Sequence, residues 1–171
     1  MHPNAVKTRF APSPTGHIHL GNARTALFNL LLARHHDGVF LLRMEDTDAE
    51  RSREEFIHSI QVDLRWLELN WHEGEGEGGP HGPYRQSLRG AIYQEYYARL
   101  EQAGLVYPCF CTPQELAVSR KARLNAGQPP RYSGKCACLN REEQQMRLEQ
   151  GINPALRFRV PRGRTIEFDD L

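Results

Sequence analysis

The chain has 171 residues, and its 22 lysines and arginines nearly balance its 21 aspartates and glutamates. This balance excludes an overall electrostatic signature of nucleic-acid binding, so any RNA contact must come from local patches. No apolar stretch approaches membrane-spanning length, and residues 1–7 have no apolar core, so we expect neither a membrane segment nor a secretory leader. The composition is that of a globular protein, and we expect a cytoplasmic location.

The first predicted elements are a strand, a proline-stiffened turn and a helix. The run 6–10 predicts the strand, and Pro12 and Pro14 fix the backbone of the turn. Apolar residues then recur with helical spacing, at Leu20, Ala23, Leu27, Leu30 and Leu31. His19 and Gly21 therefore lie where a helix begins, and the free N–H groups of a helix start can bind phosphate. Gly21 lacks the side chain that would keep a nucleotide away.

A second strand and a second helix follow. The apolar run 39–44 predicts a buried strand, which gives the strand–helix–strand start of a parallel α/β layer. Ser52 with Glu55 predicts a capping box for a helix with the apolar stripe Phe56, Ile60, Leu64 and Leu67. The glycine-rich segment 73–82 predicts a loop.

The rest of the chain predicts three helices and a hairpin. The helices are expected within 87–104, 112–127 and 140–151, each ended by a glycine. Ser87 is the expected cap of the first, and Thr112 with Glu115 and Asn140 with Glu143 are expected to begin the other two. Residues 157–160 alternate like a half-buried strand, and 165–168 are expected to be its hairpin partner.

The segment 9–24 resembles the HIGH-signature region of class I aminoacyl-tRNA synthetases, and more narrowly its glutamyl-tRNA synthetase form. That form reads Arg-Phe-Ala-Pro-Ser-Pro-Thr-Gly-x-x-His-hydrophobic-Gly, and Asn22 stands at the last HIGH position. An ordinary strand–turn–helix would leave the Pro-Ser-Pro-Thr-Gly run unexplained. The resemblance implies a Rossmann-like catalytic half. In it, His19, Gly21 and Asn22 are catalytic, and ATP contacts Pro12, Thr15, Gly16, His19 and Gly21.

An acidic run follows the second predicted strand, where ligands bind in parallel α/β sheets. The residues 43–48 resemble the Arg-Ile-Glu-Asp-Thr-Asp run of glutamyl-tRNA synthetases, with Met44 in place of Ile. The resemblance implies that Glu45 holds the α-amino group of L-glutamate. Arg9, Ala11 and Ser13 would line the rest of the pocket, with Arg9 facing a carboxylate. The alternative is that residues 46–48 only form a polar turn.

All four cysteines lie in one segment, as Cys109-Phe110-Cys111 and Cys136-Ala137-Cys138. Clustered thiolates in a cytosolic chain favour tetrahedral Zn²⁺ over disulfides, and four free core cysteines are the alternative. The segment resembles the zinc-bearing acceptor-binding insertion of some bacterial glutamyl-tRNA synthetases. Related glutamyl-queuosine-tRNA(Asp) synthetases use a tyrosine four residues before the last cysteine, a spacing that Tyr132 keeps. We expect a structural Zn²⁺ on Cys109, Cys111, Cys136 and Cys138, because thiolate is the softer ligand, with Tyr132 as the alternative.

The resemblance covers nearly the whole chain. It implies ATP-dependent ligation of L-glutamate to tRNA(Glu) through glutamyl-adenylate, with Mg²⁺ accompanying ATP. Residues 1–105 would hold the first half of the Rossmann-like catalytic domain. Residues 106–171 would hold an α+β acceptor-binding insertion that is truncated before the second catalytic half. The 171-residue chain is then an incomplete enzyme, and the full-length protein is expected to be a monomer.

Arg85 follows a Gly-Pro-Tyr element that also resembles the glutamyl-tRNA synthetase pattern. It either approaches the acceptor end of tRNA or is a surface arginine near a helix cap. Two alternative functions stay open: a glutamyl-queuosine-tRNA(Asp) synthetase, and a non-catalytic tRNA- or zinc-binding fragment. The Gly-Pro-Tyr element and the long spacing between the two cysteine pairs argue against the first.

Overall fold

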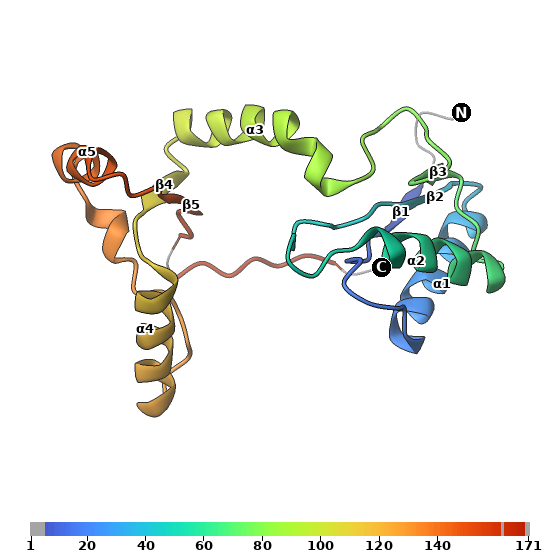
Figure 1. Cartoon of the computed structure of the whole chain (residues 1–171), viewed down its shortest axis with the longest axis horizontal. Helices are drawn as coiled ribbons and strands as arrows, with labels where there is room; N and C mark the ends of the chain where they lie inside the picture. The colour runs from blue at the N-terminus through green and yellow to red at the C-terminus, as the bar shows by residue number, and fades with distance from the viewer. Residues whose placement is uncertain (1–5, 162, 170–171) are drawn as a thin grey trace. The chain divides into compact units, whose positions relative to one another are not determined.

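The computed structural model describes residues 6–161 and 163–169 (Figure 1). The chain separates into two compact units, Met1–Gln94 and Glu95–Leu171, which we call the first and second units. The boundary lies within helix α3 (Gly90–Gln102), ahead of the division expected after residue 105. No helix in the described ranges is long and apolar enough to cross a membrane. The expectation of no leader rests largely on residues 1–5, which lie outside the described residues.

The first unit contains a three-stranded parallel sheet in the order β1-β2-β3. Its elements are β1 (Lys7–Phe10), α1 (Leu20–His35), β2 (Val39–Leu42), α2 (Glu54–Trp66) and β3 (Glu73–Gly74). The pairing of β1 with β2 runs from Lys7 opposite Val39 to Phe10 opposite Leu42. The predicted parallel α/β layer is therefore confirmed. The short strand β3 is a correction, because it lies in the segment predicted to be only a loop.

Helix α1 faces the core with small residues rather than with the predicted leucine stripe. Its buried residues are Ala26, Leu30 and Ala33, which share one helical face. Of the five predicted positions only Leu30 is buried, and Leu20 is 86% exposed. Alanines let the helix approach the sheet closely. The rest of the core comes from β1, β2, α2 and the segments that follow β2 and α2. These residues are Phe10, Phe40, Leu42, Met44, Ile57, Ile60, Leu64, Leu69 and Trp71.

The predicted capping box of α2 is wrong. The helix begins at Glu54 after Arg53, whose side chain makes no capping hydrogen bond. The hydroxyl of Ser52 is buried without a hydrogen-bond partner among the described residues. The backbone carbonyl of Pro14 accepts a hydrogen bond from the N–H of Arg53 at 3.1 Å, so the turn before α1 fixes where α2 starts.

The predicted capping role of Ser87 is also wrong. A short 3-10 helix, η1 (Gln86–Arg89), precedes α3. The carboxylate of Asp46 accepts hydrogen bonds from the Ser87 N–H at 2.8 Å and from its hydroxyl at 2.6 Å. A residue 41 positions earlier thus fixes this turn.

The second unit combines a two-stranded antiparallel sheet with short helices. Its elements are β4 (Val106–Cys109), α4 (Pro113–Asn125), the 3-10 helix η2 (Lys135–Cys138), α5 (Arg141–Glu149) and β5 (Ala155–Phe158). The predicted capping boxes at Thr112 and Asn140 are confirmed. The predicted hairpin is wrong, because β5 pairs with β4 and no strand forms in the described range 163–169.

Candidate functional site

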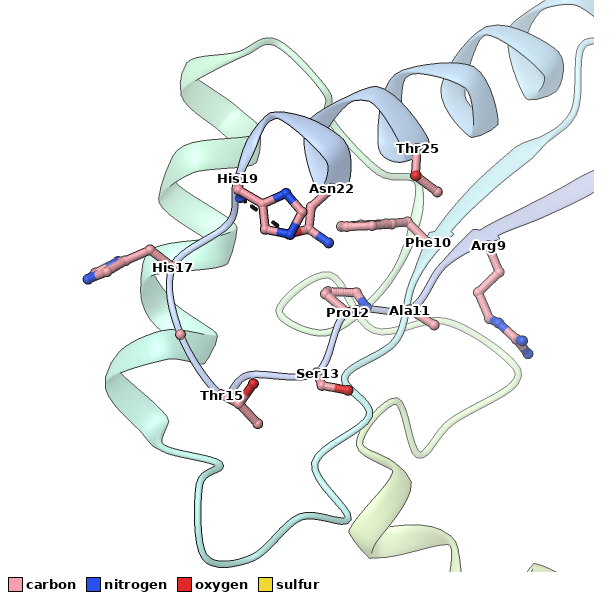
Figure 2. A pocket seen from close by; sticks show the side chains of 11 residues that line it. Arg9, Phe10, Ala11, Pro12, Ser13, Thr15, His17, His19, Asn22 and Thr25 are labelled. Carbon is pink, nitrogen blue, oxygen red and sulfur yellow. Dashed lines mark hydrogen bonds between the residues drawn. The ribbon is translucent and has the colours of Figure 1, made fainter. Parts of the chain in front are cut away.

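A cavity of about 510 Å³ opens between the end of β1 and the start of α1 (Figure 2). It is lined by Arg9, Phe10, Ala11, Pro12, Ser13, Thr15, Gly16, His17, His19, Asn22 and Thr25. Eight of these were predicted site residues: Arg9, Ala11, Pro12, Ser13, Thr15, Gly16, His19 and Asn22. Of those expected around glutamate and ATP, only Gly21 and Glu45 are absent from the lining.

His19 is the N-cap of α1. Its Nδ1 accepts a hydrogen bond from the Gly21 N–H at 3.1 Å, and the Asn22 Oδ1 accepts one from the His19 N–H at 3.2 Å. The two residues therefore form a reciprocal capping box. With Nδ1 as an acceptor, the proton of a neutral ring lies on Nε2. The start of α1 has no acidic residue in its first turn, so its positive end stays available to an anion.

Gly21 has a reason to be glycine that the sequence did not indicate. A Cβ at this position would lie 3.0 Å from Cε1 and 3.1 Å from Nδ1 of His19. Real Cβ atoms rarely approach other atoms so closely, so an added side chain would push the ring. The expectation was that Gly21 makes room for a nucleotide. The structure adds that it makes room for the His19 ring.

Glu45 is tied to the wall of the cavity through its backbone. Its N–H donates to the Pro12 carbonyl at 2.9 Å, which extends the β1–β2 pairing beyond the strands. The Arg43 guanidinium donates to Glu45 Oε1 at 2.8 Å. Sequence reasoning missed Arg43 as a site residue. The spacing of Arg43 and Glu45 could have indicated it, since side chains two residues apart in an extended segment point to the same side.

The side chains of the cavity divide into two groups (Figure 2). His19 and Asn22 lie together at the start of α1, whereas Arg9 extends away from them on the far side of Ala11. His17 points outward, and its Nδ1 lies 2.9 Å from the Ser59 hydroxyl. The arrangement places a helix start and an arginine at opposite ends of one cavity.

Arg85 is engaged by two carboxylates. Its guanidinium donates to both oxygens of Glu54, at 2.8 and 2.7 Å, and to Glu75 Oε1 at 2.8 Å. These partners raise the pKa of Arg85 above its ordinary value. Hydrogen bonding to Arg85 in turn lowers the pKa of Glu54, despite partial desolvation. These contacts favour the second of the two roles considered for Arg85, that of an arginine near a helix start, where it anchors the chain before α3.

A cysteine cluster lies in the second unit, at the end of β4 and in η2. The sulfur atoms of Cys109, Cys111 and Cys136 all lie within 4.8 Å of one another. The Tyr132 hydroxyl is 3.3 Å from the sulfurs of both Cys109 and Cys111. Cys138 is exposed and is not part of the cluster. The structure therefore brings together three of the four preferred ligands, with Tyr132 where Cys138 was expected.

Electrostatics in the cluster favour a thiolate at Cys109. Burial opposes its ionisation, but hydrogen bonds from the Tyr132 hydroxyl, the Cys111 backbone and Arg157 outweigh burial and lower the pKa of Cys109 to about 6. Burial and the neighbouring thiols raise the pKa of Cys111 to about 11. Burial and the adjacent sulfurs also raise the pKa of Tyr132. A cation entering the cluster would displace the protons that remain.

The first unit defines an α/β protein of the Rossmann-like class, in which ligands bind beyond the carboxyl ends of parallel strands. A family model for tRNA synthetases class I (E and Q), catalytic domain, matches residues 5–171. The chain belongs to this family.

Similar proteins carry glutamate-specific names. Glutamate--tRNA ligase 2 of Alkalilimnicola ehrlichii is 58% identical over 171 residues, which are all of this chain and 36% of that protein. Glutamate--tRNA ligase 1 of Methylococcus capsulatus is 58% identical over 167 residues, covering 98% of this chain and 35% of that protein. The chain thus spans only about a third of the length of these curated relatives.

Two solved structures have the same fold. The crystal structure of glutamate-tRNA synthetase from Elizabethkingia anophelis matches with a TM-score of 0.89 and 37% identity, covering 98% of this chain and 35% of that one. A glutamate tRNA ligase from Elizabethkingia meningosepticum, in complex with its amino acid, matches with a TM-score of 0.87, at the same identity and coverage. The resemblance to glutamyl-tRNA synthetases drawn from the sequence is confirmed. None of these matches supports the queuosine-modifying alternative.

Proposed function

We propose that this chain supplies the part of a glutamate–tRNA ligase that binds ATP and L-glutamate. In the reaction, the α-carboxylate of glutamate attacks the α-phosphate of ATP, which gives glutamyl-adenylate and releases pyrophosphate. The terminal ribose of tRNA(Glu) then takes the glutamyl group from the adenylate. Neither step requires a covalent protein nucleophile, so the protein acts by positioning and by stabilising charge. Mg²⁺ is proposed only as the companion of the ATP phosphates.

The single observation that carries this proposal is the start of α1 at His19. The ring caps the helix through Nδ1 and keeps Nε2–H for a ligand in the cavity that His19 and Asn22 line. The helix start adds its own partial positive charge. A phosphate in the cavity would therefore meet a donor that is already oriented, at no cost of reorganisation.

The far end of the same cavity suits glutamate. Arg9 lies there, Ala11 and Ser13 line the same cavity, and an arginine can hold a carboxylate through two parallel hydrogen bonds. Glu45 is fixed by its backbone bond to Pro12, and Arg43 occupies only one of its carboxylate oxygens. The second oxygen, Oε2, is the group we propose for the ammonium of the substrate.

A structural Zn²⁺ in the second unit is part of the proposal. Ligands about 2.3 Å from a tetrahedral centre lie roughly 3.8 Å apart, which agrees with the sulfur separations and with the position of the Tyr132 hydroxyl. We assign the site to Cys109, Cys111, Cys136 and Tyr132. Bound there, the ion would cross-link segments that share little apolar core. We propose that residues 106–171, cross-linked by this ion, form the insertion that receives the tRNA acceptor end.

Glutamate-dependent exchange between pyrophosphate and ATP, with tRNA(Glu) present, tests the proposal. Two proteins are needed: this chain alone, and a fusion of it to the part of the Alkalilimnicola ehrlichii ligase that the match does not cover. We expect exchange by the fusion and none by the chain alone. A folded fusion that shows no exchange, or that exchanges equally with aspartate, would overturn the proposal.

A further inference from the structure

Strand β5 and the residue just after its end present two arginines to the cysteine cluster. Arg157 and Arg159 are two residues apart, so an extended backbone directs both to the same side. The guanidinium of Arg157 lies over the Tyr132 ring, 4.1 Å from its centroid. The guanidinium of Arg159 lies 4.9 Å from the centroid of the Tyr107 ring. Each arginine thus stacks on a tyrosine from a different segment around the cluster.

The two arginines reach every segment that carries a cluster donor. Tyr107 belongs to β4, which ends at Cys109, and it is paired with Arg157 in the sheet. Arg159 also donates to the carbonyl of Ala137 in η2, between the last two cysteines, at 3.2 Å. Its backbone N–H donates to the Leu105 carbonyl at 2.7 Å. Arg157 on β5 and Arg159 just beyond it therefore hold β4, the Tyr132 segment and η2 together.

The positive charge of Arg157 can also balance the negative charge of a metal-loaded cluster. A divalent ion on three thiolates carries at least one net negative charge, which a half-buried cation beside it can balance. The Nε of Arg157 is buried without a hydrogen-bond partner among the described residues, so no other contact competes for this nitrogen there.

We propose that Arg157 and Arg159 act as a two-arginine clamp, which positions Tyr132 and η2 for metal binding and in which Arg157 balances the charge of the loaded site. Both are positioning residues and neither touches the ion. The inference rests on the zinc site proposed above. It makes β5 a part of the metal centre, although β5 contributes no ligand.

Zinc affinity of the full 171-residue chain, measured by competition with a chromophoric chelator, tests the clamp. We expect Arg157→Gln to weaken zinc binding by about 10- to 100-fold, as loss of an outer-shell partner does. Arg157→Lys keeps the charge but not the planar stacking, and should fall between Arg157→Gln and the unaltered chain. Arg159→Gln should weaken binding less, and Arg120→Gln, an exposed arginine on α4, serves as the matched control.

Cobalt substitution adds a spectroscopic readout. The thiolate-to-cobalt charge-transfer band of Arg157→Gln should keep its intensity per bound ion, because all three cysteines remain. Its d–d bands should move toward those of Tyr132→Phe, because the unstacked ring no longer holds its hydroxyl at the ion. An unchanged zinc affinity together with an unchanged cobalt spectrum would overturn the clamp.

Three further outcomes are decisive. If Arg157→Gln fails to fold with zinc by circular dichroism, Arg157→Lys decides: several-fold weaker binding supports the clamp, and unaltered affinity overturns it. If the unaltered chain binds no zinc, the metal site proposed above is wrong and the clamp falls with it. A loss in Arg120→Gln equal to that in Arg157→Gln would also overturn the clamp.

Discussion

The Nδ1 atom of His19 accepts the backbone N–H of Gly21 at 3.1 Å, so an imidazole ring caps helix α1. Serine, threonine, aspartate and asparagine are the usual residues at this position. Unlike them, a capping imidazole keeps a second, outward donor at Nε2. In the proposed function, capping and ligand binding are two functions of one side chain, and substitution can separate them.

Gly21→Ala should lower activity without lowering stability. The added Cβ would displace the His19 ring, while alanine favours helix over glycine by up to about 1 kcal/mol. We expect the fusion to lose about tenfold or more in exchange rate, as when an oriented donor is displaced. Its melting temperature should stay equal or rise. Gly90→Ala is the control, because a Cβ at this helix start meets open space. Equal rates in both variants would contradict the account.

Glu73→Gln should destabilise the first unit in a pH-dependent way. Burial opposes ionisation of Glu73, but hydrogen bonds from Lys7, Tyr84 and His81 outweigh it and lower its pKa. The ionised carboxylate therefore stabilises the fold above its unfolded pKa near 4.5, and this stability is lost as pH falls through the lower, folded pKa.

Urea unfolding of the chain measures this effect. Near pH 7 we expect Glu73→Gln to cost about 2 kcal/mol, the usual range for hydrogen bonds to a charged group. As pH falls below the unfolded pKa near 4.5, the difference from the unaltered chain should shrink, because the carboxylate then takes up its proton more readily in the unfolded chain than in the folded one. The exposed Glu50→Gln serves as the control. A difference that stays constant or grows as pH falls would show that the Glu73 charge is not responsible.

Single-cysteine variants should separate the zinc ligands from Cys138. Cys136→Ser removes a buried donor of the cluster and should abolish stoichiometric zinc binding. Cys138→Ser alters an exposed thiol and should leave it intact. Tyr132→Phe should bind zinc more weakly with all cysteines present. Metal analysis of the purified variants decides: zinc lost from Cys138→Ser but kept by Tyr132→Phe would restore the ligand set first expected from the sequence.

Arg85→Lys should affect folding rather than RNA binding. A lysine cannot donate to Glu54 and Glu75 with the same planar geometry, so we expect a loss of about 1 kcal/mol in unfolding free energy. The affinity of the folded fusion for tRNA(Glu) should change by less than about twofold, because this guanidinium is already occupied. Weaker tRNA binding at unchanged stability would instead assign Arg85 to the acceptor end.

Local sequence patterns predicted the elements whose causes are local. The capping boxes at Thr112 and Asn140 use only residues three apart, and both are present. Ser52 with Glu55 has the same local signal and does not cap, and Ser87, a residue type common at N-caps, does not cap either. Instead of capping the helix, the hydroxyl of Ser87 donates to the carboxylate of Asp46, which is remote in sequence and also accepts the Ser87 N–H. Tertiary partners override local capping preference here.

The remaining corrections come from long-range pairing. Strand β4 contains Pro108, which argues against a strand by local rules, but β5 pairs with it from about 50 residues later. The predicted partner 165–168 offered a shorter connection that the fold does not use. In the candidate site, the cavity-lining turn was predictable because its residues are contiguous. The position of Tyr132, rather than Cys138, beside the other three cysteines was not predictable, since it depends on how η2 turns.

The most direct measurement compares His19→Asn with His17→Asn in the exchange assay of the fusion. Asparagine can still cap α1, so His19→Asn removes Nε2–H and leaves helix stability nearly unchanged. His17 lines the same cavity but points away from it toward Ser59. The account predicts a loss of about 100-fold or more for His19→Asn, the effect of removing one oriented donor, and less than about twofold for His17→Asn. Equal activity of the two variants, at equal melting temperature, would contradict the assignment of the α1 start as the phosphate site.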